Sequence, residues 1–290
     1  MSKHNDFYLT VHYPTFLGFP ANWVSSKAVI IGIPFDAGST WKPGCRLAPL
    51  KIREVSQNIE TYDPIGKRDA ATLPVADAGD VIECILPNRM ISVVEKVVSV
   101  FYSENKLVAS LGGDHTVTLG VLKGLSERKT LVMFDAHLDY RNEYPVGERI
   151  THATVLRRAC EWDLIEYALL IGVRGVSREE VETLEKEGRA KIMYAWATEE
   201  ELKDAFSTLN RRIYISVDID VLDPSIAPGV TCPEPGGLTY TQLCKALSAL
   251  SSFKVLGLDI VEVNPLLDIN DLTSYVTAKL LSKLLINLVS

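Results

Sequence analysis

The sequence predicts an α/β protein in which helices cover both faces of a mainly parallel central sheet. From residue 107 onward, short apolar runs typical of buried strands alternate with segments whose apolar residues recur at helical spacing. No change in composition divides the chain, so we expect a single domain over residues 1–290. Ligands in such sheets bind beyond the carboxyl ends of the strands, and site residues are expected there.

The elements before residue 107 are less regular. Residues 28–33 (AVIIGI) have the composition of a buried strand, and a loop rich in Pro and Gly follows them. Residues 49–60 carry apolar side chains at helical spacing, and residues 91–102 do so again. Between these two helical segments, residues 63–80 are interpreted as irregular and rich in turns.

The later alternation gives strands at 107–111, 130–134, 168–173, 191–194, 213–219 and 255–261, and helices at 117–125, 154–160, 177–187, 240–250 and 272–288, with one more helix opening after 198. Capping boxes are expected at Ser177 with Glu180, at Thr198 with Glu201 and at Thr239 with Gln242. The leucines of the last helix form a wide stripe that we assign to the core.

The composition favours chemistry on small molecules. The net charge is −7 and the pI is about 5.4, so no basic surface for nucleic acid or an anionic membrane is expected. The acidic balance suits a cationic substrate. Five scattered cysteines without a C-x-x-C pair suit reduced thiols, and neither a secretory leader nor a membrane span is recognisable. We therefore expect a cytoplasmic protein.

The apolar run Leu131 to Phe134 leads into three polar residues at alternate positions, Asp135, His137 and Asp139. In an extended chain alternate side chains point the same way, so two carboxylates and an imidazole converge. Burying them without a partner would be very costly, and a bound cation is the usual solution. This stretch predicts a metal site at the end of a buried strand.

Three other expected strands also end in acids or histidine. Residues 107–111 lead into Asp114 and His115, residues 213–217 lead into Asp218 and Asp220, and residues 255–258 lead into Asp259 and Glu262. Each motif alone has an ordinary explanation as a turn or a solvated strand end. Together they deliver acids and imidazoles to one edge of the sheet.

The candidate metal ligands from these strand ends are His115, Asp135, His137, Asp139, Asp218 and Asp220. Six ligands are too many for one tetrahedral site but suit two metals that share carboxylates. A set of carboxylates and imidazoles without a thiolate favours Mn²⁺ and related ions. Such a pair of metals activates water, so hydrolysis is the expected reaction.

The blocks SLGGDHTVTLG, FDAHLD, SVDIDVLDPSIAPG, PEPGGLT and LDIVEVNP resemble, in this order, signature blocks of the ureohydrolases, the family of arginase, agmatinase and their relatives. PFDAGSTWKPGCRLAPLKIRE and VADAGD resemble N-terminal blocks of the same family. The resemblance implies a three-layer α/β/α fold of the arginase type and two Mn²⁺ ions per subunit. It also implies that a hydroxide bridging these ions hydrolyses a guanidinium group to urea and an amine. Members are usually homo-oligomers, trimers or hexamers.

The resemblance also implies roles for individual residues. Asp135 and Asp218 would bridge the two metals, one of which is also held by His115 and Asp139, and the other by His137 and Asp220. Glu262 resembles the glutamate that holds the guanidinium group by paired hydrogen bonds. His152 matches the histidine that passes a proton to the leaving amine. Asp114 would not bind metal itself but would orient the residues that do.

The loop between residues 139 and 152 is where the family binds the far end of its substrate. Arg141 and Glu148 stand where arginases place Asn and Ser, which argues against arginine as the substrate. Glu143 and Glu148 suit the ammonium group of agmatine, and PEPGGLT resembles the agmatinase side of the family. We therefore expect hydrolysis of agmatine to putrescine and urea.

Alternatives remain at this point. Arg141 could pair with a substrate carboxylate, which would make the protein a guanidinobutyrase or another guanidino-acid hydrolase. Val230, Thr231 and Cys232 depart from the family's usual pattern in APGVTCPEPGG, beside the predicted ligands. A non-catalytic metal-binding relative is a different class, but the complete set of ligands argues against it. A two-metal phosphoesterase lacks an obvious basic cradle for phosphate.

Overall fold

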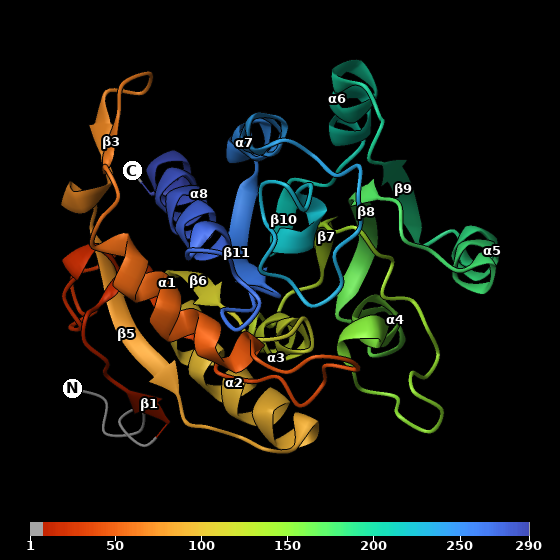
Figure 1. Cartoon of the computed structure of the whole chain (residues 1–290), viewed down its shortest axis with the longest axis horizontal. Coiled ribbons are helices and arrows are strands. Elements are labelled where there is room, and N and C mark those ends of the chain that lie inside the picture. Colours follow the sequence, from red (N-terminus) through yellow and green to blue (C-terminus); the bar gives the residue numbers. More distant parts are fainter. Residues whose placement is uncertain (1–7, 290) are drawn as a thin grey trace.

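The computed structural model describes residues 8–289 and places a nine-stranded sheet at the centre of the molecule (Figure 1). The strand order is β1-β5-β2-β6-β11-β10-β7-β8-β9, and every pairing is parallel except that of β1 with β5. The strands are β1 (Leu9–Thr10), β2 (Ala28–Gly32), β5 (Val75–Val81), β6 (Leu107–Leu111), β7 (Lys129–Phe134), β8 (Ile165–Val173), β9 (Ala190–Tyr194), β10 (Arg212–Asp218) and β11 (Lys254–Val261).

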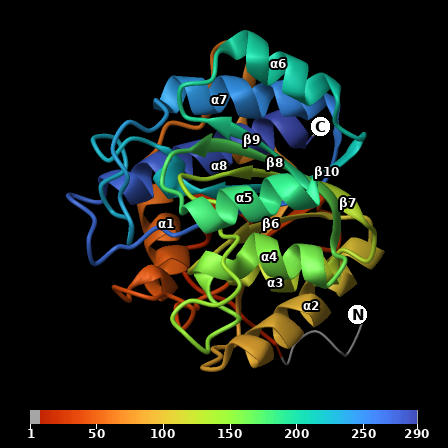
Figure 2. The same ribbon diagram turned by 90° about the vertical axis from the view of Figure 1, so that its right-hand side faces the viewer.

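Helices cover both faces of this sheet, which confirms the predicted three-layer architecture (Figure 2). One face packs against α1 (Ala48–Ser56), α6 (Glu199–Ser207), α7 (Tyr240–Ala249) and α8 (Leu272–Leu288). The other face packs against α2 (Pro87–Ser103), α3 (Val117–Gly124), α4 (Val155–Glu161) and α5 (Arg178–Glu187). Among residues 8–289, no helix is long and apolar enough to cross a membrane.

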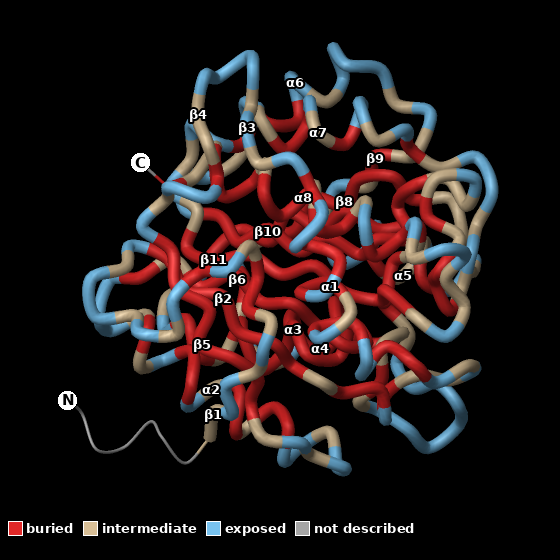
Figure 3. Tube along the Cα trace, turned by 60° about the vertical axis from the view of Figure 1, so that its left-hand side comes forward, coloured by how far each residue is buried: buried red, intermediate tan, exposed pale blue. Residues whose placement is uncertain are grey.

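The two layers of core follow from side-chain alternation along the strands. In β7, Val132 and Phe134 belong to one core cluster, whereas Leu131 and Met133 belong to the other. Because both faces are covered, β7 is buried along its whole length and β10 from its second residue onward, and buried residues fill the centre of the molecule (Figure 3). The three capping boxes predicted for α5, α6 and α7 are all present.

The prediction of an irregular segment over residues 63–80 is wrong. A short hairpin of β3 (Tyr62–Asp63) and β4 (Arg68–Asp69) begins it, and the buried strand β5 ends it. The sequence of β5, VADAGDV, does not look like a buried strand because it contains two aspartates and a glycine. Arg53 on α1 explains their burial: it donates two hydrogen bonds to Asp77, at 2.8 and 2.9 Å, and another to Asp80.

The strand order brings the polar strand ends together. Strands β6, β11, β10 and β7 are consecutive neighbours in the middle of the sheet and run in the same direction. Their carboxyl ends therefore form one edge. These four strands are the ones that lead into His115, Glu262, Asp218 and Asp135, so the predicted site residues meet at this edge.

Candidate metal centre

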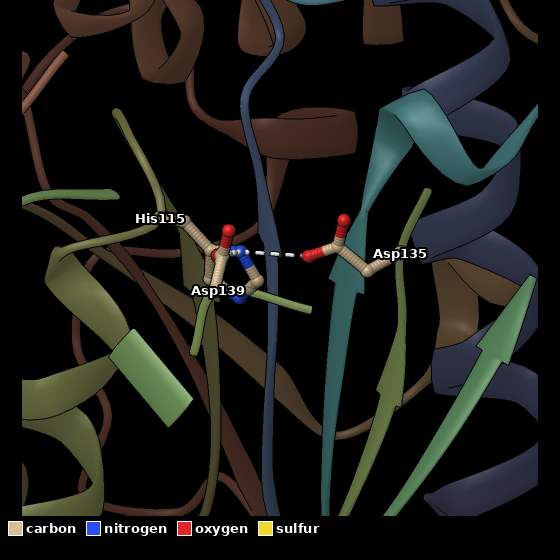
Figure 4. Close-up of side chains that lie close together, drawn as sticks. All are labelled: His115, Asp135 and Asp139. Carbon is tan, nitrogen blue, oxygen red and sulfur yellow. Dashed lines mark ion pairs between the residues drawn. The ribbon is translucent and has the colours of Figure 1, made fainter. Parts of the chain in front are cut away.

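One group of ligands gathers around the buried imidazole of His115. Its Nδ1 lies 3.0 Å from Oδ2 of Asp139, 3.1 Å from Oδ2 of Asp135 and 3.4 Å from Oδ2 of Asp218. Figure 4 shows the side chain of His115, which follows β6, close to those of Asp135 and Asp139, which both follow β7. Three carboxylate oxygens surrounding one nitrogen make a compact set of possible metal ligands.

A second group lies beside the first and shares Asp135 with it. Nδ1 of His137 is 3.0 Å from Oδ2 of Asp220 and 3.5 Å from Oδ1 of Asp135. Asp135 thus presents Oδ2 to His115 and Oδ1 to His137. The arrangement contains two adjacent donor groups linked by a carboxylate, as a pair of metal ions requires.

The side chains of these two groups of possible metal ligands do not satisfy one another's charges and hydrogen bonds, and a bound cation would. Within the described part of the chain, Nδ1 of His115 and Oδ2 of Asp135 are both buried without a hydrogen-bond partner, although they are only 3.1 Å apart. Burial, with the charge of Asp135, raises the pKa of Asp139 to about 6. Burial and the charges of Asp220 and Asp135 raise the pKa of Asp218 well above its usual range. A bound cation would relieve both the repulsion and the missing contacts.

Local backbone geometry holds these side chains in place. Oδ1 of Asp135 accepts a hydrogen bond from the backbone N–H of His137 at 2.6 Å, and Oδ1 of Asp218 accepts one from Asp220 at 2.9 Å. Asp139 and Glu262 have φ values of 48° and 64°, in the left-handed region that side chains other than glycine rarely adopt. Strained backbone of this kind concentrates at functional sites.

Glu262 and His152 are in direct contact next to the first group. Oε1 of Glu262 accepts a hydrogen bond from the backbone N–H of His115 at 2.8 Å and lies 3.1 Å from Nδ1 of His152. The other ring nitrogen, Nε2, accepts the backbone N–H of Thr40 at 3.2 Å and lies 2.9 Å from its hydroxyl. The neutral ring of His152 therefore carries its proton on Nδ1, toward Glu262.

Asp114 anchors the loop that brings Thr40 to this histidine. Its carboxylate is fully buried and accepts hydrogen bonds from the backbone N–H groups of Gly38, at 2.7 Å, and Thr116, at 3.0 Å. Through this contact the loop after β2 is tied to the end of β6.

The donor groups form the floor of a cavity of about 850 Å³. Its outer wall includes Trp41, Arg141, Tyr144, Cys232 and Glu234. The guanidinium of Arg141 lies 4.5 Å from the ring centre of Tyr144, and its Nε is 3.7 Å from a carboxylate oxygen of Glu180. The cavity thus combines an acidic floor with an aromatic and charged wall.

The structure brings the predicted residues together except for two acids in the loop after Asp139. The cavity is lined by five of the six predicted metal ligands, and the sixth, Asp135, lies against them. It is also lined by Glu262, His152 and Arg141. Glu143 and Glu148 do not line it, and both are exposed. Glu148 lies in a turn where the backbone N–H of Tyr144 donates to its carbonyl and its own N–H donates to the carbonyl of Pro145. Glu234 is instead an acid in the cavity wall, and the sequence offered only its position within PEPGG as a signal.

Comparison with known proteins places this site in a family. The profile of the Arginase family matches residues 26–287. The chain belongs to the arginase family. Membership confirms the predicted resemblance to the ureohydrolases.

Two sequence relatives illustrate the similarity. Agmatinase of Halalkalibacterium halodurans is 33% identical over 273 residues, which cover 92% of this chain and 93% of that protein. Guanidinobutyrase of Pseudomonas aeruginosa is 32% identical over 280 residues, which cover 92% of this chain and 88% of that protein.

Solved structures of arginase-family proteins share the fold. The agmatine ureohydrolase of Thermoplasma volcanium superposes with a TM-score of 0.85 at 36% sequence identity, covering 92% of this chain and 91% of that one. The proclavaminate amidino hydrolase of Streptomyces clavuligerus superposes with a TM-score of 0.87 at 28% identity, covering 96% and 97%. The arginase-like three-layer fold predicted from the sequence is confirmed.

Proposed function

We propose that this protein is a ureohydrolase that cleaves agmatine to putrescine and urea. The observation that carries the proposal is the pair of His–Asp groups joined by Asp135, in which Nδ1 of His115 is buried and unpaired among three carboxylates. Several relatives similar over most of the chain are agmatinases, which supports agmatine as the substrate.

The two donor groups are proposed to hold two Mn²⁺ ions. His115, Asp135, Asp139 and Asp218 would hold one ion, and Asp135, His137, Asp218 and Asp220 the other, with Asp135 and Asp218 shared. Oxygen and imidazole donors without a thiolate suit Mn²⁺. When bound, such a pair of ions supplies Lewis acidity that lowers the pKa of water toward neutrality.

Glu262 is suited to bind the guanidinium group. Its Oε1 is fixed by the backbone of His115 and by His152, whereas Oε2 lies 3.6 Å from Sγ of Cys45, a weak donor. A carboxylate held in this way can orient a planar guanidinium through charge-assisted hydrogen bonds. It would place the guanidinium carbon above the floor of the cavity.

His152 is suited to protonate the leaving amine. Burial favours the neutral ring, but the charges of Glu262, Asp114 and Asp139 outweigh burial and raise the pKa of His152 to about 9. A protonated ring in the cavity wall can donate its proton as the amine departs. On protonation Nε2 becomes a donor, so the ring gives up the hydrogen bond from the backbone N–H of Thr40 and donates instead to the hydroxyl of Thr40, 2.9 Å away.

The outer wall would bind the far end of the substrate. The side chain of Glu234 is 40% exposed and its Oε1 lies 3.9 Å from Nε2 of His137, so its charge faces the cavity near the floor. A carboxylate there suits the ammonium group of agmatine. Arg141, which also lines the cavity, favours the second candidate, guanidinobutyrase, because a guanidinium can pair with a substrate carboxylate.

A substrate panel tests the proposal. Purified protein loaded with Mn²⁺ is assayed for urea release from agmatine, arginine, guanidinobutyrate, guanidinopropionate and guanidine. Agmatine should give the highest kcat/KM. Absence of urea from every compound, with metal content verified, would refute a ureohydrolase, and preference for guanidinobutyrate would assign Arg141 the dominant role.

We also propose that residues 1–290 act as one domain in a cytoplasmic homo-oligomer, a trimer or hexamer that takes part in polyamine biosynthesis. Light scattering coupled to gel filtration measures the number of subunits, and cell fractionation followed by immunoblotting locates the protein.

A further inference from the structure

A buried chain of hydrogen bonds runs from the back of His115 into the core. Nε2 of His115 lies 3.0 Å from Oγ of Ser216, and that hydroxyl donates to Oδ1 of Asp259 at 2.6 Å. Ser216 is on β10 and Asp259 on the neighbouring strand β11, paired in register. All three side chains are at most 1% exposed, so water does not compete for these contacts.

Asp259 is surrounded by hydroxyl donors. Its Oδ2 accepts hydrogen bonds from the hydroxyl of Tyr214 at 2.6 Å and from that of Thr118 at 2.7 Å, while Oδ1 accepts the one from Ser216. Three donors satisfy an ionised carboxylate, which has only acceptors to offer. The protonated acid would have to give up one of these bonds.

This network determines which nitrogen of His115 carries the proton. The hydroxyl of Ser216 has a single hydrogen, and Asp259 takes it, so toward His115 the oxygen of Ser216 can only accept. The proton of the neutral imidazole then lies on Nε2. Nδ1 is left with its lone pair toward Asp135, Asp139 and Asp218, where it is available to a metal ion held by the same carboxylates.

We infer that Asp259 is a positioning residue which, through Ser216, locks His115 in the tautomer that binds metal. The inference rests on the proposed metal centre and adds a determinant of its affinity. Partners behind a metal-binding histidine fix the orientation and tautomer of the ring, and their loss weakens metal binding by roughly 10- to 100-fold.

Ser216→Ala and Asp259→Asn test this inference. Ser216→Ala removes the acceptor for the N–H at Nε2 of His115. Asp259→Asn removes the negative charge that holds the hydroxyl hydrogen of Ser216 away from His115. Thr118→Val is the matched control. It removes one hydroxyl that donates to Asp259 but leaves the hydrogen bonds from Asp259 through Ser216 to His115 intact. The probe is Mn²⁺ alone, titrated into metal-free protein, with unbound Mn²⁺ measured by electron paramagnetic resonance.

The wild type should bind two Mn²⁺ per subunit. Ser216→Ala and Asp259→Asn should weaken one of these sites by roughly 10- to 100-fold, while Thr118→Val stays close to the wild type. At saturating Mn²⁺, the KM for agmatine should be unchanged in all of them. If one of the two principal variants does not fold, as judged by circular dichroism of the metal-free protein, the other carries the test.

Two results separate failure of this inference from failure of the metal centre. If the wild type binds no Mn²⁺, the proposed function fails first. If the wild type binds two ions and the folded principal variants bind them equally well, or if Thr118→Val weakens binding as much as they do, Asp259 has no positioning role.

Discussion

The carboxylate of Asp135 joins the two donor groups, since each of its oxygens faces a different histidine. Asp135→Asn keeps the volume but replaces one oxygen by an amide that donates hydrogen bonds and cannot bridge two cations. We expect Mn²⁺ content and urea release to be lost together, as measured by plasma mass spectrometry and a urea assay. Full activity with fewer than two ions per subunit would contradict a shared carboxylate.

The contacts of His152 point to proton transfer rather than metal binding, because both ring nitrogens are engaged by Glu262 and Thr40. His152→Ala should lower kcat by roughly 100-fold or more and leave two Mn²⁺ in place. His12→Ala is a suitable control because His12 pairs with Asp80, whose other oxygen meets Arg53, away from the cavity lining. Normal turnover by His152→Ala would remove the proposed proton donor.

Lys129, at the start of β7, is 1% exposed and donates hydrogen bonds to the carbonyls of Leu122 and Leu125. Burial lowers its pKa from 10.5 to about 8, against the opposing charge of Glu127. Between these pH values the unfolded chain binds the proton that the native protein has released. The free energy of unfolding therefore gains on the order of 3 kcal/mol from this group as pH rises through that window.

The measurement is the difference in the free energy of unfolding between wild type and Lys129→Met, obtained from urea titrations at several pH values. Taking the difference cancels tyrosines and thiols that titrate in the same range. The free energy of unfolding of the wild type minus that of Lys129→Met should increase from pH 8 toward pH 10.5. A difference that does not change with pH would show that Lys129 has the same pKa in both states.

At the scale of elements, α1 and β5 depend on one buried cation. Arg53 on α1 is 0% exposed and holds Asp77 and Asp80 of β5. Arg53→Met leaves the buried carboxylate of Asp77 without its cationic partner and Asp80 with His12 alone, and should reduce the free energy of unfolding by roughly 3–5 kcal/mol. Arg128→Met, which breaks an exposed pair with Asp163, should change it by less than about 1 kcal/mol. Urea denaturation of both variants measures the contrast.

The same pair of elements marks the limit of prediction from sequence. Strands β7 and β10 were recognisable because each contains a mostly apolar run buried on both faces, LVMF in β7 and IYISV in β10. Strand β5 was missed because its acids are neutralised by a residue 24 positions earlier, and no local pattern reveals such a partner. The contact of Thr40 with His152 spans 112 positions and was missed for the same reason.

At the scale of the whole molecule, the parallel sheet was predictable but its strand order was not. Alternating strands and helices require parallel neighbours, and the motifs at the strand ends pointed to the candidate ligands that the structure brings together. That β6, β11, β10 and β7 are adjacent is a property of the assembled sheet. The loop after Asp139 contributes Arg141 to the cavity lining, whereas the turn at Pro145 leaves Glu148 outside that lining.

The proposed ligands come from three strand ends spread over more than a hundred residues, so metal binding should stabilise the whole sheet. Mn²⁺ at a hundred times its Kd adds about 2.7 kcal/mol, which raises Tm by roughly 5 °C or more. Differential scanning calorimetry with Mn²⁺ and with EDTA measures this shift. The shift should be absent in Asp135→Asn, and an equal shift in that variant would place the metal elsewhere.

The floor and the wall of the cavity are built from different kinds of structure, strand ends and loops. Its floor is formed by the ends of strands locked in the middle of the sheet, whereas Trp41, Tyr144 and Glu234 in its wall belong to the connecting loops. Loops accept insertions and substitutions at little cost to the folded state. An enzyme built this way can evolve, or be engineered, toward a new guanidino compound by remodelling the wall while the reaction at the floor is inherited unchanged.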